Sequence, residues 1–103
     1  MRIVRSSHYT AERPWGADLI AAMADATVRL HWTDQPYPWH VNDGAEVFAV
    51  MDGAVDMHYR ADGEERVARL QAGDIFYADQ GDAHSAHPCG AARILVIERA
   101  GSP

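Results

Sequence analysis

The sequence predicts an all-β fold, an antiparallel double-sheet jelly roll or barrel. Turn-forming residues recur about every 8 to 12 residues, which is the spacing of β-sandwiches and barrels. Asp-Gly pairs lie between β-prone runs in "MDGAV" and "RADGEE", a strong short-range signal for a β-hairpin. Several runs also alternate apolar and polar residues, as half-buried strands do. The length of 103 residues fits a single domain over 1–103.

The N-terminal part of the chain has the weakest strand signal. Residues 1–14 lack a core of their own, and we expect them to form an N-terminal arm. In "WGADLIAAMADA", Trp15, Leu19 and Met23 lie at helical spacing, and the alanines favour helix. Because β-prone segments surround this stretch, we predict a strand over 18–23, followed by a turn.

The remaining elements are short strands. In "TVRLHWT", Val28, Leu30 and Trp32 share one face of a strand. Arg29 and His31 share the other, and His31 is expected to face solvent. "TDQPYPW" is predicted as a loop, because its prolines remove backbone donors and fix φ. Further strands are predicted over residues 46–51, 54–60, 65–70, 74–78, 84–88 and 93–98.

Composition and charge exclude several classes of protein. The chain is 48% hydrophobic and 23% charged, which excludes a disordered protein. The net charge is −6, there is no Lys, and the nine Arg are scattered, so we expect no nucleic-acid partner. No apolar run approaches the roughly 20 residues that span a bilayer, so we expect no membrane partner. A single cysteine, Cys89, and the lack of a signal peptide indicate a cytoplasmic protein.

Two segments far apart in the sequence carry residues that bind metals. "PWHVNDGAEVFAVMDG" places His40 and Asn42 two apart, so that they point the same way on a strand, and Glu46 opens the next strand. "GDIFYADQGDAHSAH" brings a further strand and a turn to His84. Two imidazoles and one carboxylate are ligand types that bind Fe(II), Mn(II), Ni(II) or Zn(II) and leave positions open for a substrate. Asn42 would either add a neutral oxygen or stand beside the metal and bind substrate.

These two segments resemble the paired motifs of the cupin family. The first cupin motif reads His-x-His, then Glu, then Gly, and its spacings are matched here by His40, Asn42, Glu46 and Gly53. The second reads Gly, then Pro-x-Gly, then His, and is matched by Gly73, Asp79, Gly81 and His84. The resemblance covers roughly residues 27–98 and implies a small single-domain cupin with a jelly-roll barrel.

The sequence departs from the family pattern at two positions. Asp79 stands where the family usually has proline, and Asp also suits a turn. Asn42 stands where the family usually has its second histidine, and an amide binds borderline metals more weakly than an imidazole. The resemblance implies His40, Glu46 and His84 as metal ligands, with Asn42 as a further candidate.

The resemblance also implies a homodimer, in which the arm pairs with the sheet of a neighbour, and a pocket for a small-molecule ligand. One hypothesis is an enzyme that uses a divalent metal ion on a small polar molecule, such as a sugar derivative or an organic acid. Isomerase or dioxygenase chemistry would suit such a site. The alternatives are a ligand-binding or sensor cupin, with or without metal, and a structural dimer with a vestigial pocket.

Four further residues are candidates for the substrate pocket. Phe48 shares the parity of Glu46 along its strand, which points both towards the same interior. Tyr77 is a candidate pocket wall, with core packing as the alternative. His58 would look into the barrel, and His87, just before a proline, would lie at the pocket mouth. For both histidines the alternative is a position on the surface.

Overall fold

The computed structural model describes residues 1–102 and confirms an almost purely β architecture. A short 3-10 helix, η1 (Ser6–His8), precedes the strands. The strands are β1 (Gly16–Met23), β2 (Ala26–Thr33), β3 (Tyr37–Val41), β4 (Glu46–Asp52), β5 (Ala54–Ala61), β6 (Glu64–Gln71), β7 (Ile75–Ala78), β8 (Ala83–Pro88) and β9 (Ala92–Arg99). No helix in this part of the chain is long and apolar enough to cross a membrane.

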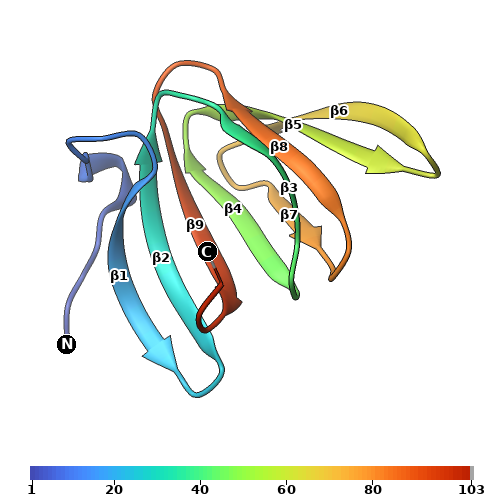
Figure 1. Cartoon of the computed structure of the whole chain (residues 1–103). Coiled ribbons are helices and arrows are strands. Elements are labelled where there is room, and N and C mark those ends of the chain that lie inside the picture. Colours follow the sequence, from blue (N-terminus) through green and yellow to red (C-terminus); the bar gives the residue numbers. More distant parts are fainter. Residues whose placement is uncertain (103) are drawn as a thin grey trace.

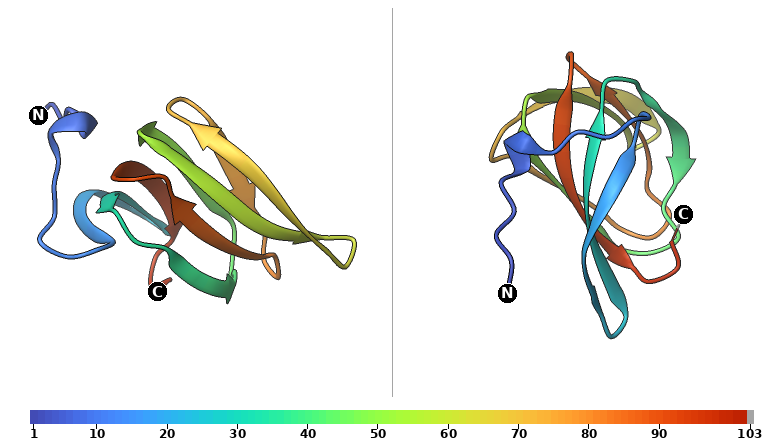
Figure 2. Two further views of the ribbon diagram at one scale, coloured as in Figure 1. Left: turned by 90° about the horizontal axis from the view of Figure 1, so that it is seen from above. Right: turned by 90° about the vertical axis from the view of Figure 1, so that its left-hand side faces the viewer.

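The strands form two antiparallel sheets that face each other (Figures 1 and 2). One sheet has the order β1-β2-β9-β4-β7 and the other has the order β3-β8-β5-β6. Consecutive strands therefore cross repeatedly between the sheets, as in a jelly roll. The candidate metal ligands of the sequence lie on β3, β4 and β8, so the crossovers bring residues from both sheets to a common interior.

The strand predicted over residues 18–23 is confirmed, and the helical alternative is wrong. β1 pairs with β2 from Gly16↔Trp32 to Met23↔Ala26, with a bulge after Leu19. The predicted loop over 33–39 is wrong in its second half, because β3 begins at Tyr37. β3 is an edge strand and pairs irregularly with β8. A strand at the edge of a sheet has backbone N–H groups that need no partner strand, so it tolerates a proline, which lacks this group.

Of the two Asp-Gly pairs predicted to form hairpins, only Asp62-Gly63 does so. Asp62 and Gly63 have φ values of 53° and 76°, and both being positive matches a type I′ hairpin turn between β5 and β6. The hairpin predicted at Asp52-Gly53 is wrong, because β4 and β5 belong to different sheets and Gly53, at φ 79°, lies in a crossover between them. A Cβ atom there would lie 2.5 Å from the carbonyl oxygen of Ala91, so this position requires glycine on steric grounds as well.

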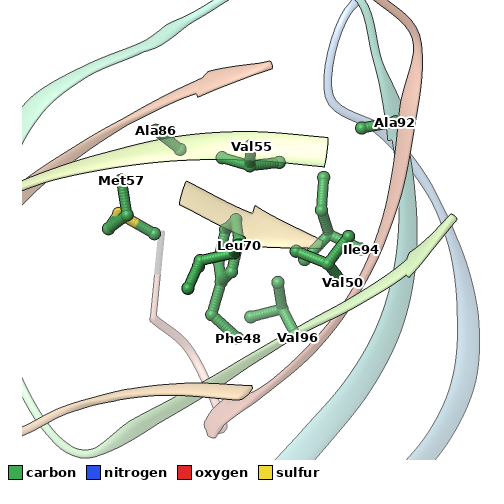
Figure 3. Close-up of a cluster of buried hydrophobic side chains, with 9 residues drawn as sticks. All are labelled: Phe48, Val50, Val55, Met57, Leu70, Ala86, Ala92, Ile94 and Val96. Atoms are coloured by element: carbon green, nitrogen blue, oxygen red, sulfur yellow. The ribbon is translucent and has the colours of Figure 1, made fainter. Parts of the chain in front are cut away.

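The hydrophobic core lies between the two sheets (Figure 3). β4, β5 and β9 contribute alternate residues to it, as the pleat requires, and β6 and β8 contribute one residue each. Its buried members are Phe48, Val50, Val55, Met57, Leu70, Ala86, Ala92, Ile94 and Val96. Phe48, Ala86 and Val96 also line the interior pocket described below, so the core and the pocket share one wall.

The N-terminal segment lies against the sheet of its own chain. The Arg93 side chain, on the outer face of β9, donates a hydrogen bond to the Tyr9 carbonyl oxygen at 2.8 Å. Arg2 forms an ion pair with Asp18 of β1. These contacts hold the arm on the outer surface of the five-stranded sheet. The homodimer and an exchange of arms between subunits stay predictions.

Candidate metal centre

Three side chains from three strands converge inside the barrel. His40 of β3 pairs in register with His84 of β8, and their ring centroids are 4.3 Å apart. Glu46 begins β4 in the opposite sheet and reaches the same point. One possible ligand atom from each of the three residues lies within 4.8 Å of the others, so the group could hold a metal ion. The fold thus brings together donors that are up to 44 positions apart in the sequence.

Asn42 lies beside this group and is itself buried. Two hydrogen bonds, from the Asn42 N–H to the Asp82 carbonyl and from the Gly81 N–H to the Asn42 carbonyl, hold its backbone on the β7–β8 turn at 2.9 Å each. The Asn42 Oδ1 atom is 2.7 Å from Nε2 of His84, and its Nδ2 is 3.3 Å from Oε1 of Glu46. Asn42 therefore bridges the two buried donors.

The charges of the site favour an ionised Glu46. Burial acts to raise the pKa of the Glu46 carboxyl, but hydrogen bonds from His84 and Asn42 and the charges of His84 and His40 hold it below its usual range. The Glu46 side chain is only 12% exposed. A buried carboxylate kept in its charged form is a ready ligand for a cation.

The His84 ring is enclosed on all sides and is 2% exposed. Because Asn42 Oδ1 can only accept, Nε2 of His84 donates this hydrogen bond. Nδ1 is buried and has no hydrogen-bond partner among the described residues. Packing against Phe76, at 5.4 Å between ring centroids, orients the ring in place of a second hydrogen bond.

The spacing of the Glu46 and His84 donor atoms fits a metal ion, whereas the distance between His84 and Asn42 is that of a hydrogen bond. Ligand atoms about 2.1 Å from an ion lie about 3.0 to 3.4 Å from one another in octahedral or tetrahedral sites. Nε2 of His84 lies 3.1 Å from Oε1 of Glu46, and 2.7 Å from Asn42 Oδ1. Binding through His84 Nε2 would require that atom to lose its proton and its bond to Asn42.

The donors open into an interior pocket of about 390 Å³. This volume is in the range of sites for small molecules. Its wall combines aromatic, cationic and acidic side chains with the donors themselves. The lining residues are Arg13, Trp15, Ala17, Arg29, His31, Tyr37, His40, Glu46, Phe48, His84, Ala86, Val96, Glu98 and Ser102.

Solved structures show which family has this architecture. A cupin-2 domain protein from Shewanella frigidimarina superposes with a TM-score of 0.76 and is 28% identical, over 86% of this chain and 84% of that one. A cupin superfamily protein from Desulfitobacterium hafniense has a TM-score of 0.76 at 12% identity, over 91% of this chain and 85% of that one. The chain has the cupin fold.

A larger enzyme contains the same fold. A hydroquinone 1,2-dioxygenase, solved in complex with Fe3+, matches this cupin with a TM-score of 0.73 at 20% identity, over 87% of this chain and 29% of that one. No model of a known protein family matches the sequence, and no curated protein matches it. The fold of the cupin is therefore assigned by structure.

The four candidate pocket residues of the cupin lie in different places. Phe48 lines the pocket, as its parity indicates. Tyr77 is 58% exposed and pairs with Val47 on the outer face of the five-stranded sheet. His58 and His87 stack on each other at 4.1 Å between ring centroids, on the outer face of the four-stranded sheet. The structure thus corrects the placement of these last three residues, because their strand parity is opposite to that of the inward residues.

The sequence analysis of the cupin missed part of the pocket wall. His31 faces the pocket together with Arg29, contrary to the expectation of a solvent-facing position. Burial lowers the pKa of His31, although its hydrogen bond to the Trp15 carbonyl opposes this shift. Glu98 also faces inward, and its parity with the buried Val96 was a signal for this. Tyr37 also lines the pocket, and it was missed because its segment was predicted as a loop.

Glu98 should make the stability of the metal-free cupin depend on pH. Burial and the nearby charge of Glu46 raise the pKa of Glu98 from 4.5 to about 7. Since the folded-state pKa is the higher one, ionisation opposes folding, and stability falls as pH rises through this interval. We expect Glu98→Gln to raise the melting temperature of chelator-treated protein above pH 7, and to leave it unchanged below pH 4.5.

The control is Glu65→Gln, which removes an exposed carboxylate from β6. This variant should follow the wild-type melting curve at every pH. If Glu98→Gln melts at the same temperature as the wild type above pH 7, the Glu98 carboxyl is not destabilised by its surroundings.

Proposed function

We propose that this cupin binds a divalent metal ion through His40, Glu46 and His84 and acts on a small polar molecule in the adjoining pocket. The observation that carries the proposal is the convergence of these donors, within 4.8 Å of one another, on a pocket of about 390 Å³. Two imidazoles and one carboxylate form a set suited to Fe(II), Mn(II), Ni(II) or Zn(II). The Fe3+ complex of the structurally similar hydroquinone 1,2-dioxygenase supports a metal at such a site.

In this proposal, one set of residues holds the ion and another set encloses the ligand. A bound divalent ion would supply Lewis-acid chemistry towards an oxygen atom of the substrate. Glu46 offsets the charge of the ion, and the two imidazoles complete a set that leaves positions free. Trp15 and Phe48 line the pocket and keep water away from an apolar part of the ligand.

A second candidate is a ligand-binding cupin that works without metal. One observation favours it: the bond of 2.7 Å between His84 Nε2 and Asn42 Oδ1 satisfies both buried groups in the absence of an ion. A metal must displace this bond, which lowers its affinity. The two candidates differ in whether the purified protein takes up a divalent ion.

Metal loading tests the proposed function directly. The protein is purified without chelators, analysed for metal content, and then titrated separately with Fe(II), Mn(II), Ni(II) and Zn(II) under anaerobic conditions. We expect one of these ions to reach one equivalent per chain. A content far below one equivalent that does not rise with any of the four ions would overturn the metal-dependent function and leave the metal-free one.

Asn42→His tests how Asn42 controls affinity. The substitution removes the amide that pairs with His84 and adds a third imidazole at the site. We expect the dissociation constant for Zn(II) or Ni(II) to fall by at least about tenfold, because imidazole is the better ligand for these ions. Asn42→Ala removes the hydrogen bond to His84 and adds no ligand. It therefore separates the effect of losing this bond from the effect of gaining an imidazole. An unchanged constant in Asn42→His would show that residue 42 does not face the ion.

A further inference from the structure

Arg29 presents unused hydrogen-bond donors inside the pocket. It lies on β2 and faces inward with His31. Its Nη1 atom donates to Thr27 Oγ1 at 3.0 Å and forms an ion pair with Glu98 Oε1 at 3.8 Å. The second distance is too long for a hydrogen bond. A guanidinium has five N–H donors in a planar fork, so most of those on Arg29 are free for a ligand.

Aromatic rings form an apolar wall in the same pocket as the charged Arg29. Trp15 and Tyr37 are packed edge to face with ring centroids 5.3 Å apart, and Trp15 and Phe48 are 6.5 Å apart. The Trp15 indole N–H is bonded to the Gln35 carbonyl oxygen, so the ring offers its apolar surface to the cavity. A planar apolar group stacks well on such a wall.

We infer that the ligand of this pocket is a small carboxylate with a planar apolar body, whose carboxylate pairs with Arg29 and whose body packs on Trp15, Tyr37 and Phe48. The inference rests on the proposed function, because it names the class of molecule that would lie beside the metal donors. Arg29 suits this role because its fork binds a carboxylate through two parallel hydrogen bonds. Arg13 adds a second positive charge to a lining that also includes the carboxyl groups of Glu46 and Glu98.

The shape of the pocket supports one ring system and one anionic group. A volume of about 390 Å³ is near the lower end for small-molecule sites. The guanidinium and the aromatic wall line the same cavity as the donors His40 and His84. A ligand held between them would therefore lie within reach of an ion at those donors.

Benzoate, benzamide and benzylamine test the inference, because they share a ring and differ in charge. Each is titrated into chelator-treated, metal-free protein, and binding is followed by NMR shifts of the Trp15 indole and by calorimetry. We expect benzoate to bind at least about tenfold more tightly than benzamide, which is what one charge-assisted pair contributes. Equal binding of benzamide, tighter binding of benzylamine, or no benzoate binding would overturn the inference.

Substitution of Arg29 tests whether its guanidinium binds the carboxylate of benzoate. Arg29→Gln should raise the dissociation constant of benzoate by at least about tenfold and leave that of benzamide unchanged. Arg29→Lys should recover only part of the loss, because a single ammonium cannot form the two parallel bonds. Arg66→Gln, on the exposed face of β6, is the matched control and should bind benzoate like the wild type.

The outcome is separable from that of the metal experiments. Because the titration uses metal-free protein, benzoate binding that depends on Arg29 supports the carboxylate ligand even if no ion binds. Metal loading without benzoate binding would retain the metal site and overturn the ligand class. Melting temperatures of the Arg29 variants close to that of the wild type show that a lost signal is not caused by unfolding. If either variant is unfolded, the comparison of benzoate with benzamide in the wild type decides the matter alone.

Discussion

His84→Ala should abolish tight metal binding by the cupin. His84 supplies one of the three convergent donors, and its ring is enclosed at 2% exposure. Loss of a residue that merely supports a ligand already weakens a metal site by about 10- to 100-fold. Loss of a ligand itself should therefore raise the dissociation constant by at least about 100-fold. The measurement is metal titration by calorimetry, with metal analysis of the purified variant.

Two further variants make this result interpretable. His8→Ala removes an exposed histidine from η1 and should bind metal like the wild type. His84→Gln keeps a polar side chain in the buried position, and so separates loss of the ligand from loss of packing. Retention of wild-type affinity in a folded His84→Ala protein would exclude His84 as a ligand and remove the basis of the proposed metal function.

Ile94→Ala should destabilise the fold by about 2 to 5 kcal/mol. Ile94 lies on β9, which runs between β2 and β4 in the larger sheet, and its side chain is 0% exposed. Truncation removes apolar contacts on all sides and leaves a cavity that the two sheets cannot close without moving. The change in the free energy of unfolding is measured by urea denaturation of metal-free protein, which avoids any contribution from a bound ion.

The matched control is Ile75→Ala on β7. Ile75 has the same side chain but is 68% exposed, so its truncation should change stability by less than about 0.5 kcal/mol. A loss at Ile75 as large as the loss at Ile94 would mean that the outer face of β7 is covered in solution. Equal small losses at both positions would contradict a core centred on β9.

Local sequence determined the strands and most of the turns. The alternation of apolar and polar residues predicted the strands, as Val55 and Met57 on one face of β5 illustrate, and the Asp62-Gly63 pair predicted a hairpin. These signals are local, since the period of a strand and the φ of a turn depend on a few adjacent residues. The loop predicted across Tyr37 was wrong because a strand at a sheet edge accepts proline, and edge position is not a local property.

The sequence by itself also picked out His40, Glu46 and His84 as candidate ligands, because their spacing resembles the cupin motifs. Only the tertiary structure decided that these side chains meet, that Asn42 bonds to His84, and that Arg29 lines the same pocket. The physical reason is that alternation says which residues share a face, but not which face turns inward. Arg29 and His31 on β2 share a polar face, and only the position of the opposite sheet shows that this face lines the pocket.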